Sequence, residues 1–379
     1  MKDVKITIIG GGLAGLISSI HLARVGIKAY VIEKKMYPFH RVCGEYISNE
    51  VVPYLRDLGC YPHELGPSQI NRFQLTSVNG RSSSMALDLG GFGISRYAFD
   101  QYLYLKAQSL GVRFSVGSEV DSVHYDGNVF TVGTSQQEHK ADIVIGAFGK
   151  RSRLDGYLKR GFFGRRSPYV GVKYHVRLSG FADDLIALHN FKDGYCGISQ
   201  VEEGRINLCY LTHRDNVKQY GNVHDMEKEL LFQNPFLRQI FSTATFLLEK
   251  PEVINEISFE TKSPVEHHIL MAGDAAGMIT PLCGNGMALA IHGAKVLSEH
   301  VIRYVEDKSY DRHRLEQDYT RAWNSLFSRR LWAGRQIQQL FGGVWSSNLA
   351  VSLANTTPGV ARYLMKKTHG EPFSISNGI

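Results

Sequence analysis

The chain begins with a strand–helix–strand pattern of apolar and polar positions. Residues 5–9, Lys-Ile-Thr-Ile-Ile, are a short β-branched run of the kind that forms a buried strand. Residues 13–25 carry apolar side chains at helical spacing, and Gly26 ends that helix. Residues 29–32 predict a second buried strand, which ends at Glu33. The opening of the chain therefore predicts one βαβ unit.

Helix and strand patterns alternate along the rest of the chain. Asn79-Gly80 and Asp126-Gly127 are the turns of two predicted hairpins. The other predicted elements are a loop at 34–47, helices at 49–58, 96–110 and 225–241, parallel strands at 111–114, 142–145 and 268–272, antiparallel strands at 170–177, 185–190, 195–201 and 205–211, and helical structure beyond residue 285 with a long helix at 315–340.

This order of elements predicts an α/β fold with two domains interleaved in sequence. Residues 1–68, 90–168 and 262–305 form a discontinuous Rossmann-like nucleotide-binding domain. Residues 69–89 and 169–261 form an inserted antiparallel sheet, suited to walling a substrate pocket. Residues 306–379 form a helical C-terminal region.

The turn between the first strand and helix carries a dinucleotide-binding motif, Gly10-Gly11-Gly12-Leu13-Ala14-Gly15. Gly10 permits a tight turn, Gly12 lets the backbone approach a pyrophosphate, and Gly15 allows close packing of helix on strand. The free N–H groups at the helix N-terminus attract the phosphates. Glu33 can accept hydrogen bonds from both ribose hydroxyls and would repel a 2′-phosphate, so the ligand is FAD or NAD.

Two further glycine sites follow predicted strands of the same sheet. Gly146-Ala147-Phe148-Gly149 follows residues 142–145, and Gly273-Asp274-Ala275-Ala276-Gly277 follows residues 268–272. Parallel strands present their carboxyl ends at one edge of a sheet. The three sites, in this order and with wide gaps, predict one FAD held by distant parts of the chain.

Composition narrows the class of protein without changing this picture. The 379 residues can bury a large core, and a hydrophobic fraction of 43% is ordinary for a globular chain. We expect neither a signal peptide nor a membrane span, which makes the cytoplasm the default compartment. The five cysteines lack Cys-x-x-Cys spacing and no carboxylate cluster accompanies His267-His268, so we expect no metal site and no disulfide framework.

The formal charge of +7 is concentrated in two basic clusters, at residues 150–166 and 312–335. A solvated surface is one interpretation. Contact with anionic lipid headgroups, or with an acidic carrier or donor protein, is the other. No nucleic-acid recognition motif accompanies the charge, so nucleic acid is not an expected partner.

Taken together, these motifs resemble the p-hydroxybenzoate hydroxylase-like superfamily of FAD proteins, and within it the geranylgeranyl reductase family. The resemblance covers roughly residues 3–340. It implies a second FAD contact from Arg96, at the start of a helix, and a ribityl contact from Asp274. In the family, the match of residues 281–287 wraps the isoalloxazine ring. The FAD-binding residues implied are Gly10, Gly12, Leu13, Ala14, Gly15, Glu33, Lys34, Arg41, Cys43, Gly44, Arg96, Val120, Gly149, Gly273, Asp274, Pro281, Gly284, Asn285, Gly286 and Met287.

A loop containing Arg41-Val42-Cys43-Gly44 marks the subgroup, because geranylgeranyl reductase relatives carry a similar Cys-Gly beside the flavin. Arg41 would contact the FAD phosphates or ribityl chain. Cys43 is either a packing thiol or a catalytic acid that gives a proton to the substrate. Flavin-dependent tryptophan halogenases share the scaffold but carry a Trp-x-Trp-x-Ile-Pro segment that this chain lacks, which counts against halogenation.

Phe148 is a departure from the superfamily. Aromatic hydroxylases have an Asp-Gly here that is implicated in holding both FAD and NADPH, and Phe148 cannot accept those hydrogen bonds. The electron donor is therefore left open between transient NAD(P)H and a carrier protein.

Three functions remain in view. The leading hypothesis is an FAD-dependent reductase that saturates carbon–carbon double bonds of an isoprenoid or similar hydrophobic substrate, such as a prenyl lipid, by hydride transfer from the N5 of reduced flavin. The alternative is a monooxygenase that hydroxylates an aromatic or polyketide-like substrate. An electron-transfer partner without its own substrate is a third class. The basic late helices suggest peripheral contact with a membrane.

Overall fold

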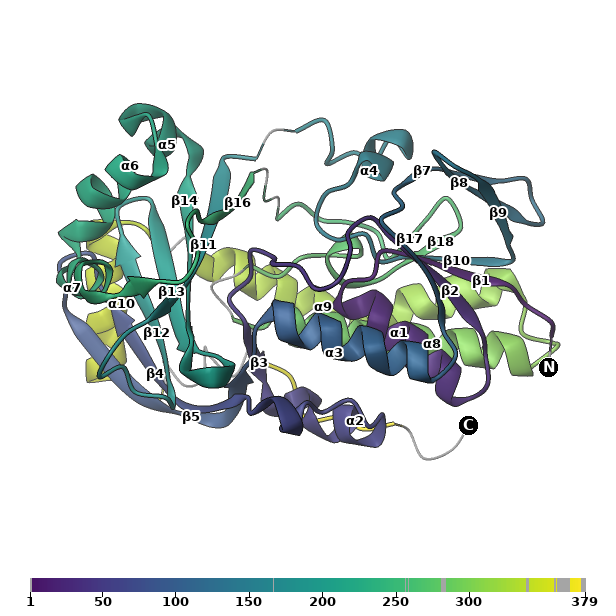
Figure 1. Cartoon of the computed structure of the whole chain (residues 1–379), viewed down its shortest axis with the longest axis horizontal. Helices are drawn as coiled ribbons and strands as arrows, with labels where there is room; N and C mark the ends of the chain where they lie inside the picture. The colour runs from purple at the N-terminus through teal and green to yellow at the C-terminus, as the bar shows by residue number, and fades with distance from the viewer. Residues whose placement is uncertain are drawn as a thin grey trace.

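A computed structural model describes residues 2–165, 167–255, 257, 259–280, 284–338, 341–357, 359 and 369–375. Over these residues the strands form three sheets, of six, nine and three strands. The six-stranded sheet and its helices lie at one end of the molecule and the nine-stranded sheet at the other (Figure 1). The predicted α/β class is therefore confirmed.

The six-stranded sheet has the order β17-β18-β10-β1-β2-β6. Every neighbouring pair is parallel except β17–β18. The apolar runs that predicted buried strands form its centre. Its strands are β1 (Ile6–Ile9), β2 (Ala29–Glu33), β6 (Arg113–Val116), β10 (Ile143–Gly146), β17 (Val265–Glu266) and β18 (Ile269–Met271).

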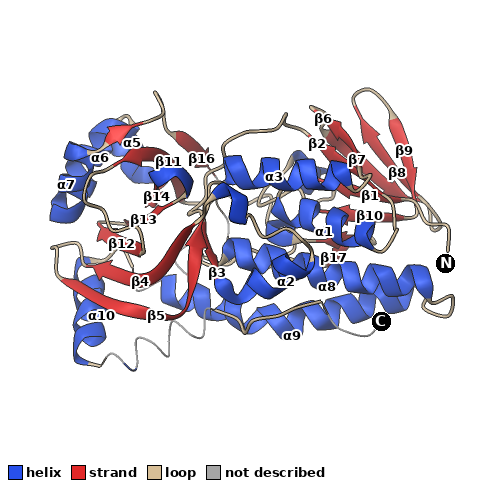
Figure 2. Ribbon diagram, turned by 60° about the horizontal axis from the view of Figure 1, so that its bottom comes forward, coloured by secondary structure: helices blue, strands red, loops and turns tan. Residues whose placement is uncertain are grey.

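Long helices build the core around this sheet. Helix α1 (Leu13–Arg24) packs on both α3 (Arg96–Ser109) and α8 (Gly286–Glu306), and α8 packs on α9 (Arg312–Gln338). Helices α8 and α9 run side by side (Figure 2). Apolar side chains cover almost every face of α1 and much of α8, because these helices are surrounded by sheet and by other helices.

The nine-stranded sheet has the order β15-β11-β14-β13-β12-β4-β5-β3, with β16 paired to β11. Strands β4 and β5 form the hairpin predicted to turn at Asn79-Gly80, and β4 joins β12 in parallel. Its strands are β3 (Tyr46–Ser48), β4 (Ser68–Thr76), β5 (Ser82–Gly93), β11 (Tyr169–Arg177), β12 (Leu185–Phe191), β13 (Gly194–Gln200), β14 (Ile206–His213), β15 (Thr245–Phe246) and β16 (Glu252–Asn255).

One face of this sheet is covered by α5 (Arg214–Tyr220), α6 (Val223–Leu230) and α7 (Pro235–Thr243). We expected a single helix over residues 225–241, and that prediction is wrong. Asn234 leaves the helical conformation, caps α7 by accepting a hydrogen bond from the Phe236 N–H, and is followed by Pro235 at the first helical position. The break places the buried Asn234 amide on the carbonyls of Ser77 and Asn190.

The remaining elements are small or lie late in the chain. Strands β7 (Val120–Tyr125), β8 (Phe130–Thr134) and β9 (Glu138–Ala141) form the third sheet, of which β9 was not predicted because it is short and polar. Helices α2 (Val52–Asp57) and α4 (Arg153–Tyr157) are short, and α10 (Val344–Thr356) packs on β4 and β5. The proposed domain boundaries stay a prediction, since β3 and the end of β5 extend the nine-stranded sheet beyond residues 69–89.

Candidate functional site

The three glycine sites meet at the carboxyl ends of the central strands. Gly10 has a φ of +103°, and a Cβ there would lie 2.4 Å from the Ala147 carbonyl oxygen of the second site. Gly273 has a φ of +59°, and its Cβ would lie 3.0 Å from the Ala14 Cβ on α1. A side chain at either position would force these segments apart. Backbone contact therefore brings sites from three parts of the chain into one cradle.

Positive charge gathers where α1 begins. Gly12 is the residue before the helix, and the nearest atoms to a Cβ built on it are the guanidinium ends of Arg41 at 3.7 Å and Arg96 at 3.8 Å. Both guanidinium groups hydrogen-bond to the buried carboxylate of Asp100, Arg96 through two bonds of 2.7 Å and Arg41 through one of 3.1 Å. An open glycine, a helix N-terminus and two fixed arginines fit a pyrophosphate.

Glu33 lies where the ribose of an adenosine would bind. Its carboxylate is 4% exposed and accepts hydrogen bonds from the backbone N–H of Gly11, at 2.8 Å, and of Lys35, at 2.9 Å. The carboxylate is thus fixed at the glycine turn, as expected. The Lys34 side chain turns away, half-exposed, to Glu119 at 3.5 Å. This leaves the Lys34 backbone for the predicted FAD contact.

Two buried cationic side chains, Lys262 and Arg160, donate hydrogen bonds to backbone carbonyls of the third glycine site. Lys262 Nζ donates to the carbonyl oxygens of Asp274, at 2.7 Å, and Lys150, at 2.8 Å. Burial lowers the pKa of Lys262 to about 8. Arg160 donates to the Ala275 carbonyl at 3.0 Å. Within the described part of the chain the Asp274 carboxylate accepts no hydrogen bond, which leaves it available for a ribityl hydroxyl.

The segment predicted to wrap the flavin ring is described from residue 284 onward, so Pro281 and Cys283 lie outside the described residues. Gly284 has a φ of +61°, and a Cβ there would lie 3.3 Å from the Tyr46 ring. Asn285 and Gly286 begin α8, and Met287 is buried behind them. The first turns of α8 lie beside the third glycine site, since Ala290 is 3.7 Å from the position of a Cβ on Gly273.

A buried group of charged residues holds the loop that carries Cys43. Glu45 contacts the Lys173 ammonium, accepts a hydrogen bond from the Arg96 N–H at 2.8 Å and lies 2.6 Å from His175 Nε2. Complete burial by itself would raise the pKa of Glu45, but Lys173 and His175 lower it to about 2. Lys173 Nζ also donates to the Arg41 carbonyl, at 3.2 Å. The loop is therefore attached to both the FAD cradle and strand β11.

Cys43 is half-buried on this loop, and its carbonyl accepts a hydrogen bond of 3.2 Å from Asn207 on β14. Cys209 lies two residues after Asn207 on β14, so both side chains are on the same face of the sheet. Burial, with the Cys43 thiol close by, raises the pKa of Cys209 to about 12, so Cys209 stays a thiol. Gly44 has open space where a Cβ would stand.

The face of the nine-stranded sheet that carries Lys173 has a polar part, with His175 and Asn207, and an apolar part. Directly opposed residues across the strands share a face, which places Lys173, Cys209, Leu188 and Leu75 on the same side. Met278, just after the third glycine site, packs into this apolar layer. Its buried members are Leu75, Leu188, Tyr195, Leu211, Ile257, Met278 and Val351. The loop with Cys43 is attached to this face through Lys173 and Asn207, while Cys43 itself packs against the core around the six-stranded sheet.

The predicted FAD contacts of Gly149 and Val120 stay predictions, because no contact in the structure bears on them. Gly149 has a φ of +86° and open space beside it, whereas Val120 is buried in the core at the start of β7. Phe148 occupies the position at which an aspartate is expected from the superfamily, and its ring lies 2.9 Å from the position of a Cβ on Gly146.

Sequence reasoning missed Asp100, Lys173 and His175. Asp100 stands four residues after Arg96 on α3, a spacing at which opposite charges pair on a helix, so this signal was present. Lys173 and His175 alternate with apolar residues on β11, a pattern that an exposed strand face would also give. Their role depends on the distant Glu45, which no local pattern reveals.

No group of three or more metal-binding side chains occurs in the described ranges, nor does any described helix have the length and apolar character to cross a membrane. The donor set instead fits FAD: an open glycine turn, two arginines at a helix N-terminus, a fixed carboxylate at the ribose position and an available Asp274.

Comparison with known proteins supports the same cofactor. The model of a family described as an FAD binding domain matches residues 3–316. The digeranylgeranylglycerophospholipid reductase 2 of Methanothermobacter thermautotrophicus is 24% identical over 368 residues, covering 91% of this chain and 89% of the reductase. The asperlicin C monooxygenase of Petromyces alliaceus is 27% identical over 340 residues, covering 78% and 72%. A solved flavin-dependent brominase superposes with a TM-score of 0.76 at 18% identity, covering 96% of this chain and 93% of the brominase.

Proposed function

Since this chain belongs to the FAD binding domain family, we propose that it is a flavin-dependent reductase that saturates carbon–carbon double bonds of an isoprenoid or similarly hydrophobic substrate. FAD as the cofactor and the resemblance to geranylgeranyl reductases are confirmed by the family match and by the archaeal reductase relative. The reaction itself is our proposal, because relatives at similar identity include a monooxygenase.

One observation carries the proposal: the half-buried Cys43 lies on a loop that is attached both to the FAD cradle and to the sheet face that carries the apolar layer. A substrate sandwiched there would have apolar side chains on one side and the flavin on the other. This arrangement suits a hydrocarbon chain better than a charged molecule.

Reduction of a double bond adds a hydride to one carbon and a proton to its neighbour. Bound reduced FAD supplies the hydride. Arg41 and Arg96, both positioned by Asp100, would hold the pyrophosphate of the cofactor, and Asp274 would bind its ribityl chain. Cys43 holds the proton on Sγ and transfers it to the carbon opposite the hydride. We propose that the electrons come either from NAD(P)H that binds transiently or from a carrier protein. Phe148 disfavours the NADPH-binding mode of the aromatic hydroxylases.

A monooxygenase is the second candidate, and the fungal monooxygenase relative is the observation that favours it. The two reactions differ in their need for oxygen and in the mass of their products. The FAD-loaded protein, reduced with dithionite under argon, should convert a prenyl lipid to a product heavier by two hydrogens. Product formed only with oxygen, and heavier by one oxygen atom, would overturn the reductase assignment.

Cys43→Ala tests the proton donor. We expect FAD content to be unchanged and anaerobic turnover to fall at least about 100-fold, the usual contribution of a positioned general acid. Cys209→Ala is the matched control, because it removes a neighbouring thiol from the same sheet face and should preserve turnover. Full activity in Cys43→Ala would show that the thiol is a packing group.

We also propose that the chain rests on a lipid surface through α10. Trp345, Leu349 and Leu353 follow one another at intervals of four and are 78%, 43% and 48% exposed. On the opposite side of the helix, Val351 is 1% exposed and packs into the apolar layer. The helix that covers the proposed substrate site therefore presents an apolar stripe outward, as interfacial helices do.

A further inference from the structure

A cavity lies between the nine-stranded sheet and helix α9. Its volume is about 360 Å³, the liquid volume of about twelve water molecules and within the range of small-molecule sites. It is formed where the start of β11, the segment before the third glycine site and the end of α9 meet. Its described lining residues are Arg165, Ser167, Pro168, Tyr169, Ile257, Phe259, Glu260, Thr261 and Arg335.

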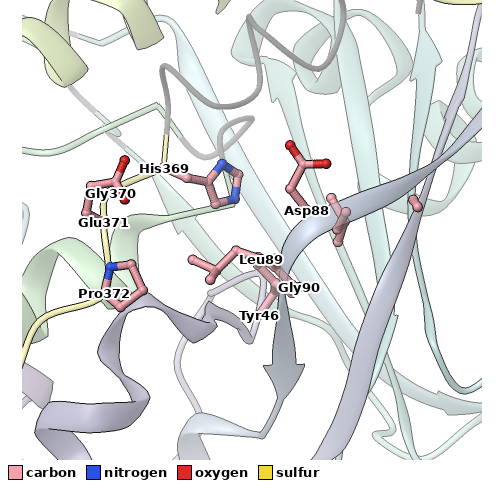
Figure 3. Close-up of a pocket in the computed structure, with 10 residues that line it drawn as sticks. Tyr46, Asp88, Leu89, Gly90, His369, Gly370, Glu371 and Pro372 are labelled. Carbon is pink, nitrogen blue, oxygen red and sulfur yellow. The ribbon is translucent and has the colours of Figure 1, made fainter. Parts of the chain in front are cut away.

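The apolar wall of this cavity belongs to the apolar layer of the nine-stranded sheet. Ile257 is a buried member of that layer, and Tyr169 and Phe259 pack against it. A smaller cavity of about 210 Å³ lies between strand β5 and residues 369–372 (Figure 3). None of the described lining residues of the smaller cavity belongs to the apolar layer. Of these two cavities, the larger one therefore adjoins the proposed substrate site.

Close contacts relate the wall of the larger cavity to both sides of the proposed site. Ile257 Cδ1 lies 2.9 Å from the position of a Cβ on Gly171 of β11, and Val42 Cγ1 lies 3.2 Å from the same position. Val42 is the residue before the proposed proton donor. Lys262, which follows the lining segment, donates to the Asp274 carbonyl at 2.7 Å. The wall of the cavity is therefore beside the loop of the proton donor and is continuous with the support of the third glycine site.

Arg335 is a half-buried cation that lines this cavity near the end of α9. Within the part of the chain that the structure describes, it has no hydrogen bond, ion pair or ring contact. The chain beyond α9 is fixed to the nine-stranded sheet, because the Gly342 N–H donates to the Asn190 side chain at 3.2 Å and the Gly342 carbonyl accepts from the Asp193 N–H at 2.8 Å. A guanidinium group can bind one carboxylate or phosphate through two parallel hydrogen bonds. Arg335 therefore offers one site for an anion.

The other charged groups of the described lining are paired with each other. Arg165 donates to both carboxylate oxygens of Glu260, at 3.3 and 3.2 Å, and both side chains are exposed. The described lining thus carries two arginines and one glutamate, a net charge of +1. Three residues next to the lining in sequence lie outside the described residues and together carry no net charge: Arg166, Glu256 and Ser258. The charge left over at the cavity is therefore that of one arginine.

We propose that this cavity binds the single anionic group, a carboxylate or a phosphate ester, of an amphiphilic substrate. Arg335 binds the anion, and the adjoining apolar part of the same molecule rests on Tyr169, Ile257 and Phe259. A diphosphate would bring more negative charge than one arginine compensates. The inference rests on the proposed reductase function, from which the apolar part is an isoprenoid chain, and deepens it by assigning the polar end of the substrate.

Three probes share one isoprenoid chain and differ in their polar end: geranate, geraniol and geranylammonium, which are anionic, neutral and cationic. Inorganic phosphate is a fourth probe, which has the charge but no chain. Each is titrated into the oxidised, FAD-loaded protein and followed by ligand-observed NMR.

We expect geranate to bind at least about 10-fold more tightly than geraniol, through a charge-assisted hydrogen bond, and geranylammonium to bind most weakly of the three. Inorganic phosphate should bind at least about 10-fold more weakly than geranate, because it buries no apolar surface. Equal or tighter binding of geraniol or geranylammonium would overturn the anion site. Equal binding of phosphate and geranate would show a site for small anions and overturn the amphiphilic substrate.

Variants at the cavity locate the bound probe. Arg335→Gln should weaken geranate about 10-fold and leave geraniol unchanged, and Arg335→Lys should restore part of the loss. Glu260→Gln should tighten geranate several-fold, because it removes a carboxylate from the cavity and releases Arg165. Arg321→Gln removes an exposed charge from the same helix and is the control, which should change neither probe. Unchanged geranate binding in Arg335→Gln would place the probe elsewhere and overturn the proposal.

These titrations involve no turnover, so the anion site and the reductase function can fail separately. Selective binding of geranate without any alkene reduction would support the anion site and remove the reductase assignment. Anaerobic reduction of a prenyl lipid, together with no preference for geranate, would support the reductase assignment and remove the anion site.

Discussion

At the scale of single residues, Gly12 and Gly15 belong to one motif but have different roles. Gly12 has an extended conformation, with φ −81° and ψ −175°, and a Cβ on it would have no neighbouring atom closer than 3.7 Å. At Gly15 a Cβ would lie 2.0 Å from the Gly10 carbonyl oxygen. Gly12 therefore keeps space for a ligand, whereas Gly15 keeps the helix close to its strand.

This difference predicts opposite behaviour for two alanine variants. Gly12→Ala should leave the stability of the FAD-free protein unchanged or slightly raised, because its backbone angles suit alanine, while FAD affinity falls at least about 10-fold. Gly15→Ala should destabilise the FAD-free protein by about 1–3 kcal/mol through overpacking. Chemical unfolding without FAD and FAD titration by flavin fluorescence measure the two effects. Similar stability losses in both variants would contradict the assigned roles.

At the scale of elements, the loop with Cys43 is joined to β11 by the buried pair of Glu45 and Lys173. Both side chains are completely buried. Such a pair is weak support for stability as a whole, but removal of one partner leaves an uncompensated charge in the interior. The pair instead fixes which part of the loop faces the sheet.

A double-mutant cycle follows from this. Glu45→Gln and Lys173→Met should each destabilise the protein by about 3–5 kcal/mol, and the double variant should lose much less than the sum of the two. Urea unfolding of the four proteins provides the measurement. Additive losses would mean that the two side chains do not depend on each other.

The same pair predicts sensitivity to acid. The folded protein holds the pKa of Glu45 at about 2, below its ordinary value of 4.5. This carboxylate therefore stabilises the fold fully above pH 4.5, and that contribution is lost as pH falls from 4.5 toward 2. Urea unfolding between about pH 7 and pH 3 should show a steeper loss of stability for the native chain than for Glu45→Gln/Lys173→Met. Parallel curves would rule out Glu45 as a source of acid sensitivity.

At the scale of the whole molecule, the FAD cradle, the apolar layer and the exposed stripe of α10 lie in succession. Helix α10 packs on β4 and β5 of the nine-stranded sheet, and its Val351 joins the same apolar layer as Met278, next to the third glycine site. A lipid bound to the exposed stripe of α10 would therefore be separated from the apolar layer of the proposed substrate site by this helix alone.

Vesicle binding tests this arrangement. We expect the chain to bind phosphatidylglycerol vesicles at low salt more tightly than phosphatidylcholine vesicles, and to release them as salt rises, since exposed arginines such as Arg329 add an electrostatic part. A Trp345→Ser/Leu349→Ser/Leu353→Ser variant should lose at least about 10-fold in affinity through lost apolar burial. Leu105→Ser, at an exposed leucine on α3, is the control. Absence of binding to anionic vesicles at low salt would remove the membrane proposal.

The cofactor and the architecture around it follow from the amino-acid sequence alone. Gly10, Gly15, Glu33 and the strands beside them are recognisable because the βαβ motif that carries them spans only about 30 residues. Arg96 and Asp274 were placed by resemblance, and the structure brings both to the cradle. Local spacing also located the long strands and helices, but it missed short elements such as β9 and β16 and joined α6 and α7 across Asn234-Pro235.

The reactive side of the molecule, by contrast, is defined by contacts between distant parts of the chain. Glu45 meets Lys173 across more than a hundred residues, and Arg335 lines a cavity whose other walls include Tyr169 and Phe259. Sequence patterns report the periodicity of one element at a time. Burial of a charge pair, or a cavity beside an arginine, depends on which distant surfaces come together, so such features become visible only after the chain has folded.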